Sequence, residues 1–353
     1  MIRMKKIDYI KILRWGLPIL AILFVILCRY QPAWAEGYAR IVYPSLSSAL
    51  SAFSSIFPFS LEEVLVVVCV LWILLFPIVQ RRKGKSWKYI GGRELEMLAW
   101  IYIWFYFGWG LNYFRYNIYT RLQTPPVKYE EQQFLDFLQA YTDSLNATYF
   151  FPMELSEETL EEEVKRFYQG LPEEVGLVSP KSYQEPNFFT FTALYSGVGV
   201  LGSMGPFFAE AQLNRDLLPV QLPFTYAHEF SHLLGVSNEA ESNYWAYRAC
   251  TESDVQAMRY SGYMGLLPYV LSNASSLLTK EQFQEWVKTI RPEIITTYND
   301  NRKYWQERYS PIIGKVQEVT YNLILKGNQI PSGRKNYAEV ISLLLSLQKE
   351  NGE

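Results

Sequence analysis

Residues 222–243 read LPFTYAHEFSHLLGVSNEAESN and contain both histidines of the chain, His228 and His232. Pro223 suits the first turn of a helix and Gly235 suits the residue after its end, so we expect a helix between them. Residues four positions apart lie on the same face of a helix. The two imidazoles can therefore reach one metal ion, unless they are core or surface histidines that align by chance.

Glu229 follows the first histidine and completes the pattern His-Glu-x-x-His. In this pattern two histidines bind zinc and the glutamate acts as the general base of a hydrolytic reaction. A catalytic zinc ion, Zn2+, also needs a third protein ligand and one position open to water. With no histidine left, a carboxylate has to supply the third ligand, and Glu239 and Glu241 are the candidates just downstream.

Residues 238–243, Asn-Glu-Ala-Glu-Ser-Asn, resemble the second signature of the thermolysin-like gluzincins, Asn-Glu-x-x-Ser-Asp. The resemblance implies that Glu239 is the third ligand, and Glu241 stays open as the alternative. It also places Asn243 where the family has an aspartate that orients a zinc-bound histidine, and an asparagine can accept the same hydrogen bond without the charge. Only six residues separate His232 from Glu239, fewer than in the gluzincins, so the chain has to turn straight back after the helix.

Three apolar segments occupy the first third of the chain, and such segments can cross a hydrocarbon core of about 30 Å. They predict a membrane anchor over residues 1–115, with transmembrane helices near residues 12–30, 60–80 and 95–114. The lipid bilayer is then a partner of the chain through three helices. A hydrophobic fraction of 49% and an aromatic fraction of 16% suit a membrane protein with a folded domain.

Charge clusters set the expected orientation in the membrane. The loop of residues 81–93 contains six Lys and Arg residues, and the N-terminus is also basic. The positive-inside rule places both in the cytoplasm, so three crossings deliver the chain after about residue 115 to the outside. We therefore expect a multi-pass protein of the cell membrane with an extracytoplasmic catalytic domain. Whether the first segment stays as an anchor or is cleaved after residues 33–35 (Ala-Trp-Ala) stays open.

Residues 116–353 are expected to form one zincin-like metallopeptidase domain, mostly helical with a small sheet. The predicted fold class is thus membrane-anchored and mainly α (α+β). Residues 130–144 and 157–169 have helical periodicity, and residues 188–200 could contain a strand or two. Residues 207–213 could form an edge strand that pairs with an extended substrate, or equally a core strand.

Charge and cysteine content argue against three features: a nucleic-acid partner, a thiolate zinc site and a disulfide framework. A net charge of -2 gives a nucleic-acid partner no electrostatic support. The three cysteines form no CxxC pair, so neither a thiolate zinc site nor a disulfide framework is indicated.

Most of the chain also resembles an uncharacterised family of bacterial membrane proteins, a domain of unknown function with a zincin-like motif. The stretches that carry the resemblance are the three early apolar segments, residues 205–211, the motif at residues 228–232, and residues 241–244, 259–263 and 321–326. The resemblance implies a zinc peptidase and supplies no substrate.

Together these features predict an enzyme, a membrane-bound zinc metallopeptidase that hydrolyses a peptide or protein substrate. Water activated by zinc would attack the peptide bond, with Glu229 as general base. An oxyanion needs a further donor, and Tyr260 and Tyr263 are the candidates, although packing is the ordinary role of such tyrosines. The histidines lie more than a hundred residues beyond the third apolar segment, so cleavage outside the bilayer is favoured.

Two other functions stay open. One is a catalytically silent, zinc-bound scaffold of the envelope, against which Glu229 argues because a scaffold needs no general base. The other is a zinc hydrolase that acts on a non-protein component of the envelope.

Overall fold

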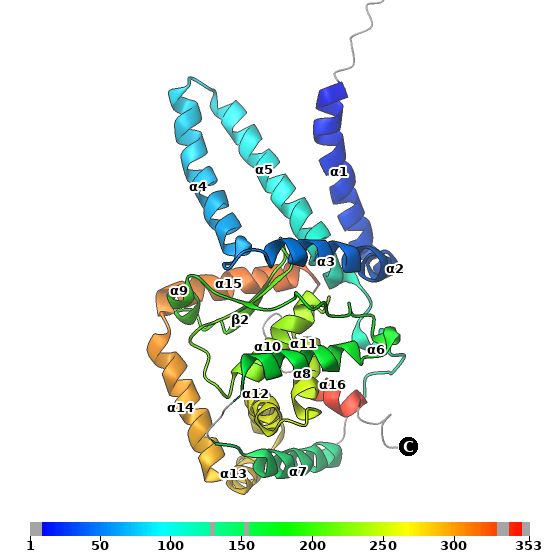
Figure 1. The fold of residues 1–353 in the computed structure, drawn as a ribbon, viewed down its shortest axis with the longest axis vertical. Helices are drawn as coiled ribbons and strands as arrows, with labels where there is room; N and C mark the ends of the chain where they lie inside the picture. The colour runs from blue at the N-terminus through cyan, green and yellow to red at the C-terminus, as the bar shows by residue number, and fades with distance from the viewer. Residues whose placement is uncertain (1–8, 128–130, 152–154, 330–338, 348–353) are drawn as a thin grey trace, which may run out of the picture.

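Three long helices project together from one side of a larger helical body (Figure 1). The computed structural model describes residues 9–127, 131–151, 155–329 and 339–347. The projecting helices are α1 (Tyr9–Tyr30), α4 (Leu61–Arg82) and α5 (Trp87–Gly108). They correspond to the three apolar segments of the sequence, but α5 begins and ends earlier than the expected span of residues 95–114.

One projecting helix could cross a membrane by itself. Among the described residues, α4 alone is both long and apolar enough, and only 6% of its most apolar window is buried. Residues 14–30 and 32–54 pass the same test only as a pair of helices bent by 109°. The first half of α5 contains Lys88, Arg93, Glu94 and Glu96, which lowers its apolarity. The structure thus shows one clear span where the sequence predicts three.

A layer of helices lies across the base of the three long ones (Figure 1). It contains α2 (Pro32–Gly37), the π-helical turn η1 (Tyr38–Val42) and α3 (Tyr43–Ser54), with α9 (Thr192–Ser196) and α15 (Pro311–Gly327) beneath them. The chain leaves α5 through the short 3-10 helix η2 (Gly110–Phe114) and enters the body.

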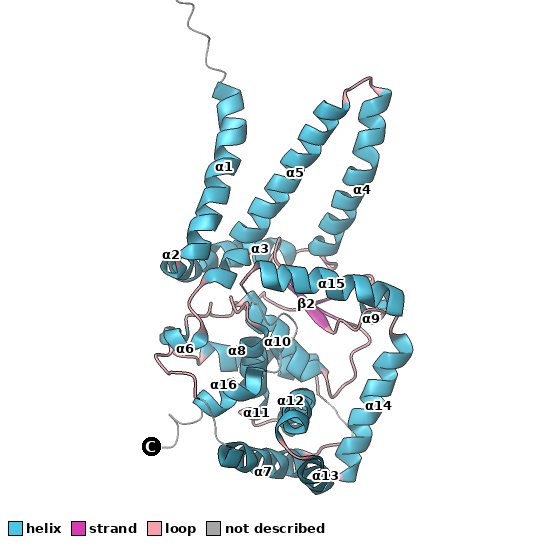
Figure 2. Ribbon diagram, turned by 180° about the vertical axis from the view of Figure 1, so that it is seen from behind, coloured by secondary structure: helices cyan, strands magenta, loops and turns pink. Residues whose placement is uncertain are grey.

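The body is mostly helical, as the sequence predicts (Figure 2). Its centre is formed by α10 (Leu222–Leu233), α11 (Glu239–Thr251) and α12 (Gln256–Leu277), which pack on one another. The expected helices over 130–144 and 157–169 are present as α7 and α8. The remaining helices of the body are α6 (Ile118–Arg121), α7 (Glu131–Thr148), α8 (Glu157–Gln169), η3 (Glu173–Val175), α13 (Lys280–Thr289), α14 (Pro292–Arg308) and α16 (Val340–Leu347).

A small sheet lies beside α10. Its strands are β1 (Asn187–Phe188), β2 (Gly202–Gly205) and β3 (Glu210–Leu213), in the order β1-β3-β2. β3 pairs in parallel with β1 and antiparallel with β2, with Gly202 opposite Leu213. All four residues of β3 are buried. Of the two alternatives for residues 207–213, the core strand is therefore confirmed, because β3 has a partner on each side.

One hydrophobic core extends across the expected domain boundary at residues 115 and 116. Tyr43, Leu111 and Phe114 belong to the same buried cluster as Phe230 and Leu233 of α10. The layer beneath the projecting helices and the helical body therefore pack as a unit.

Candidate metal centre

The two histidines lie on α10, where the sequence predicts a helix. Pro223 occupies its first turn, and the helix ends at Leu233. Gly235 has φ of 103°, a left-handed conformation that suits glycine at the end of a helix. Asn238 then caps α11 by accepting a hydrogen bond from the backbone of Glu241 at 2.9 Å. This tight turn makes the short spacing between His232 and Glu239 sufficient, since it brings the first residue of α11 back to the end of α10.

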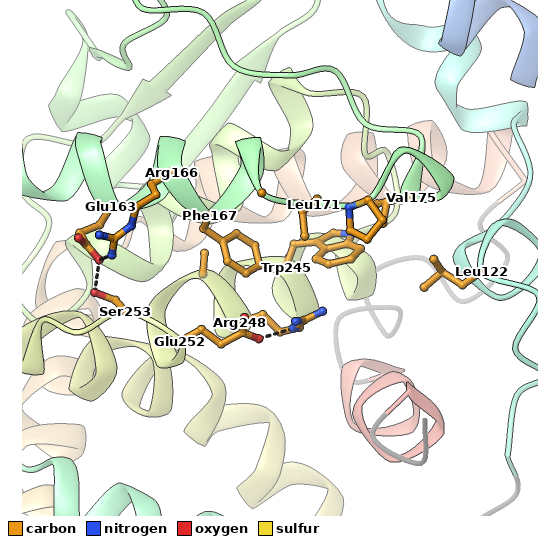
Figure 3. Close-up of a pocket in the computed structure, with 13 residues that line it drawn as sticks. Leu122, Glu163, Arg166, Phe167, Leu171, Val175, Trp245, Arg248, Glu252 and Ser253 are labelled. Atoms are coloured by element: carbon orange, nitrogen blue, oxygen red, sulfur yellow. Dashed lines mark hydrogen bonds and ion pairs between the residues drawn. The ribbon is translucent and has the colours of Figure 1, made fainter. Parts of the chain in front are cut away.

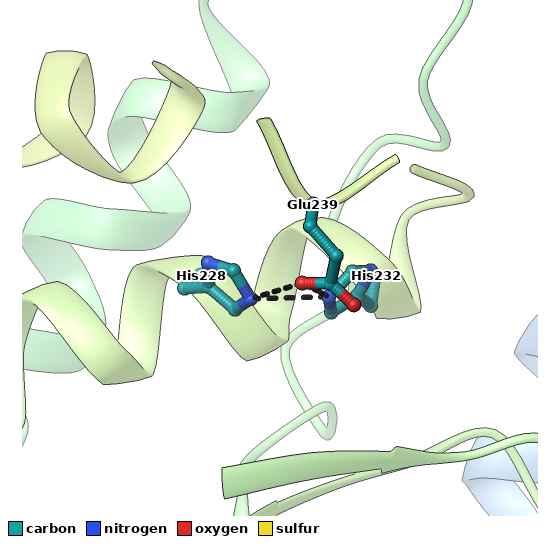
Figure 4. A group of neighbouring side chains, drawn as sticks. All are labelled: His228, His232 and Glu239. Carbon is teal, nitrogen blue, oxygen red and sulfur yellow. Dashed lines mark hydrogen bonds and ion pairs between the residues drawn. The ribbon is translucent and has the colours of Figure 1, made fainter. Parts of the chain in front are cut away.

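Three ligand atoms meet between α10 and α11 (Figure 4). His228 Nε2 lies 3.2 Å from His232 Nε2. Glu239 Oε2 lies 3.2 Å from the first ring nitrogen and 3.5 Å from the second. In a tetrahedral site with metal–ligand bonds of about 2.0–2.1 Å, neighbouring ligand atoms are about 3.3–3.4 Å apart. The three distances have this size, so a small metal ion fits between the three side chains as they stand.

Hydrogen bonds orient both imidazoles toward this point. His228 Nδ1 lies 2.9 Å from Asn243 Oδ1, and His232 Nδ1 lies 2.8 Å from the carbonyl oxygen of Val236. Both oxygens are acceptors, so each Nδ1 carries the proton and donates it. In neutral rings the two Nε2 atoms then have bare lone pairs that point at each other and at a carboxylate. Such an arrangement is repulsive unless a cation or a proton lies between the three atoms.

The pKa values agree with a positive charge at this point. Burial lowers the pKa of His232, but the charge and hydrogen bond of Glu239, the charge of Glu229 and the hydrogen bond to Val236 together raise it to about 9. Burial also acts to raise the pKa of Glu239, but His232 and His228 hold it well below its ordinary value. Without a metal ion, the cluster therefore holds a proton in the place that a metal ion would take.

Glu239, not Glu241, lies beside the two histidines. Successive residues of an α-helix are rotated by about 100°, so a residue two positions on lies about 200° away. Glu241 accordingly points to the far side of α11, where it forms an ion pair with Arg121 and accepts a hydrogen bond from Trp245 Nε1 at 3.1 Å. Asn243, one turn after Glu239, shares the face of Glu239 and reaches the other nitrogen of His228.

Glu229 lies at the edge of the same cluster, beside strand β2. A Cβ atom placed on Gly202 would lie 2.5 Å from Glu229 Cγ and 2.8 Å from Oε1. Only a glycine leaves room for the glutamate here. Burial raises the pKa of Glu229 above its ordinary value; His228 and His232 oppose this rise and Glu239 adds to it. A raised pKa suits a group that has to take up a proton near neutral pH.

Two residues of the expected anchor, Tyr43 and Trp109, hold the end of α10. The last carbonyl groups of a helix have no partner inside it. Here Trp109 Nε1 donates to the carbonyl of His232 at 2.8 Å, and the Tyr43 hydroxyl donates to the carbonyl of Leu233 at 2.8 Å. The rings of Trp109 and His232 also meet edge to face, with centroids 6.1 Å apart. Tyr43, Trp109 and Gly202 could not be predicted as part of the site, because no local sequence pattern connects them with the histidines.

The two candidate tyrosines lie elsewhere. Tyr260 packs against Tyr149, with ring centroids 5.5 Å apart, and burial raises its pKa to about 12. Tyr263 packs against Tyr141 and Tyr247. In the described part of the chain, neither hydroxyl forms a hydrogen bond with the histidines, Glu229 or Glu239. The structure therefore does not bring these tyrosines into the metal-ligand cluster.

A cavity of about 490 Å³ opens on the other side of α11 (Figure 3). The α11 residues that line it are Trp245, Arg248 and Ala249, on the face opposite Glu239 and Asn243. Its charges are paired: Arg248 Nε lies 2.5 Å from Glu252 Oε1, for example. The cavity contains none of the metal-ligand candidates, so it is separate from the site.

Comparison with known proteins adds a family match. A family model described as "Protein of unknown function (DUF3810)" matches residues 38–345. No curated protein and no solved structure matches the chain.

Proposed function

The chain belongs to the DUF3810 family, and we propose that its function is the zinc-dependent hydrolysis of peptide bonds at a membrane. The observation that carries this proposal is the convergence of His228 Nε2, His232 Nε2 and Glu239 Oε2 at distances of 3.2, 3.2 and 3.5 Å. Two imidazoles and one carboxylate, with a fourth position open, form the ligand set of catalytic zinc in many peptidases.

The donor set favours zinc over other metal ions. Imidazole ligands disfavour magnesium and calcium, which prefer oxygen, and tetrahedral geometry disfavours copper(II) and nickel(II). When bound, zinc would lower the pKa of a water molecule toward about 7 and polarise the carbonyl of the scissile bond. The hydrogen bonds from Nδ1 of both histidines would keep the two rings in the orientation that binding requires.

Glu229 is the proposed general base and acid. It would accept a proton on a carboxylate oxygen and later pass it to the leaving amine. Its carboxylate adjoins β2, and β2 is one of the two edge strands of the sheet. The outer edge of β2 forms no hydrogen bond within the described residues, so an extended substrate could add to it as a further strand. This proposal moves the substrate-binding edge from residues 207–213 to Gly202–Gly205.

The membrane arrangement is proposed from the same combination of sequence and structure. The basic loop between α4 and α5 lies at the end of these helices far from the body (Figure 1). With this loop in the cytoplasm, the body lies outside it. We take α1, α4 and α5 as three spans, which makes the chain a multi-pass protein of the cell membrane.

Zinc content of the purified full-length protein tests the site. We expect about one zinc per chain, and Glu239→Gln should lower zinc affinity by about 10-fold or more, as expected when a ligand of such a site is lost. Glu241→Gln is the matched control on the same helix. It should keep zinc but lower the melting temperature, because it leaves buried Arg121 without its ion pair. Zinc loss in Glu241→Gln but not in Glu239→Gln would overturn the assignment of the ligand.

Hydrolysis by the Glu229→Gln variant tests the mechanism. The variant should bind zinc as wild type does and lose about 10²–10⁴-fold in activity, the usual contribution of a general base. A mixture of unstructured peptides is the substrate, and mass spectrometry detects the products. Zinc-loaded wild-type protein that cuts no peptide would refute the peptidase function, and activity that survives in Glu229→Gln would refute the mechanism.

A further inference from the structure

Strand β2 connects the proposed base with the start of the membrane helix. At one end, Gly202 lies against the Glu229 carboxylate. At the other end, a Cβ atom on Gly205 would lie 3.0 Å from the Cγ and Oε2 atoms of Glu62, the second residue of α4. Three steps along a strand cover about 10 Å. The base therefore lies only about 10 Å, measured along β2, from the helix that is long and apolar enough to cross a membrane.

Hydrogen bonds make this short connection rigid. Glu210 of β3 accepts hydrogen bonds from Ser60 Oγ and from the backbone of Leu61 and Glu62, each at 3.0 Å. Glu63, which is 3% exposed, accepts from the backbone of Thr190 at 2.8 Å and of Phe191 at 3.1 Å. The first turn of α4 is thus bonded to both ends of the sheet region. A hinge between membrane helix and sheet is incompatible with these contacts.

The end of α5 also lies close to the site. Trp104 Nε1, in its last turn, donates to the carbonyl of Phe207 at 3.0 Å. Trp109, the residue after its end, contacts His232 directly. The histidines are more than a hundred residues from this helix in sequence, yet they lie next to its end. The sequence distance therefore says nothing about the distance of the site from the membrane.

Exposed apolar side chains surround the start of α4. They lie on α3, on the loop that follows it, on α9 and on α15, which form the layer beneath the projecting helices (Figure 1). We call this set the apolar rim; its members are Phe53, Ile56, Phe59, Phe191, Leu194 and Leu323, between 41% and 73% exposed. Apolar groups next to a membrane helix suit the interfacial layer of the bilayer, which keeps the site at the membrane surface.

From these contacts we infer that the substrate is the juxtamembrane segment of a membrane-anchored polypeptide. A substrate strand paired with β2 covers the distance from Glu229 to the bilayer surface in about three to six residues. The scissile bond then lies that close to the anchor, on the same side of the membrane as the body. This inference rests on the proposed peptidase function and adds the substrate class.

The test uses full-length protein, loaded with zinc and reconstituted in lipid nanodiscs. The probe is a single membrane-spanning helix that carries a mixed-sequence, unstructured tail of about 30 residues. A matched probe has a proline-rich spacer of about 12 residues between helix and tail, which extends about 37 Å. Both probes share the anchor, so their local concentration at the enzyme is equal. The same tails without a helix complete the set, and mass spectrometry maps the cuts.

We expect cuts about three to six residues from the end of the probe helix, and about tenfold slower cleavage with the spacer, because the spacer carries the tail beyond the reach of β2. Cuts scattered along the tail, with equal rates with and without the spacer, would overturn the juxtamembrane substrate. Cuts inside the helix would overturn it as well, in favour of cleavage within the bilayer. Glu229→Gln is run in parallel and should cut none of the probes. If wild type cuts no probe and no free tail, the proposed peptidase function itself is refuted.

Discussion

Gly202 is the residue on which the position of the proposed base depends. Its backbone conformation does not require glycine, since it is not among the glycines with positive φ. The requirement is space, because a Cβ atom there would collide with Glu229 Cγ at 2.5 Å and with the Gln212 carbonyl oxygen at 2.9 Å. A glycine that looks like a turn residue in the sequence is thus part of the site.

Gly202→Ala should therefore displace Glu229 and leave the metal ligands in place. We expect hydrolysis to fall by about 10²-fold, the effect of a misplacement of about 1 Å at a reacting group, with zinc content unchanged. The control is Gly37→Ala in α2, where an added Cβ atom has nothing within 4 Å, so activity should stay near the wild-type value. Zinc analysis and rate measurements on the two proteins check this. Equal activity of both variants would contradict the role of Gly202.

At the scale of elements, the cluster joins α10 to α11. Their connection is a short turn, and each helix contributes ligand atoms to the same point. A bound metal ion would therefore act as a clamp between the two central helices. A ligand that binds only the folded state stabilises it, and metal binding adds a dependence on pH because the ligands have to be deprotonated.

The stabilisation by zinc should grow as the pH rises. In the metal-free protein, the pKa of His232 is raised from 6.5 to about 9 by Glu239 despite burial. Its contribution to stability is complete below about pH 6.5 and is lost as the pH rises through about 9. The contribution of Glu239, whose pKa is lowered, is present above its ordinary value near 4.5 and so stays constant in this window.

Melting temperatures of full-length protein with zinc and with a chelator, near pH 6 and near pH 9, measure the effect. The difference between the melting temperature with zinc and that with the chelator should widen toward high pH, because the metal-free protein loses stability while zinc competes with fewer protons. Glu239→Gln is the control and should show a small gap at both values. A gap that narrows from pH 6 to pH 9 would contradict the assignment of these three groups as ligands.

At the scale of the whole molecule, the layer beneath the projecting helices completes the core and the polar contacts of the body. Arg115 forms an ion pair with Glu36 at 2.9 Å and donates to the carbonyl of Gly176 at 2.9 Å. Tyr43 is fully buried and caps α10. Residues from the expected anchor therefore satisfy polar groups of the expected domain and fill part of its core.

A fragment of residues 116–353 should fail to fold on its own. It would lack the Tyr43 and Trp109 hydrogen bonds to α10 and the buried side chains of Leu111 and Phe114. We expect no cooperative thermal transition and less than one zinc per chain, while full-length protein in detergent shows both. Near-ultraviolet circular dichroism and zinc analysis check this. A fragment that melts sharply and binds one zinc would show that the layer beneath the projecting helices is dispensable for folding of the body.

The residues of the candidate metal centre could be predicted from the sequence. The histidine spacing and the helix end at Gly235 depend on helix geometry over a few turns, and local patterns encode such geometry. The resemblance to the gluzincins favoured Glu239 and left Glu241 open, and the structure places Glu239 beside the histidines. The mostly helical body could be predicted for the same reason. The environment of the apolar segment near residues 95–114 was harder to predict, because apolarity does not distinguish a lipid environment from a protein core. Its last part, η2, enters the core of the body, where Leu111 is fully buried.

The surroundings of the candidate ligands follow from tertiary packing. Gly202 contacts Glu229 across 27 residues of sequence, and Trp109 contacts His232 across 123 residues. The position of β2 at an edge of the sheet depends on the order of the strands. No local rule encodes such contacts, since they arise when distant segments pack to bury apolar surface. For that reason the sequence alone points to a metal site, whereas the closeness of this site to α4, the helix that could cross a membrane, follows from the packing of the start of α4 and the end of α5 against the sheet and α10.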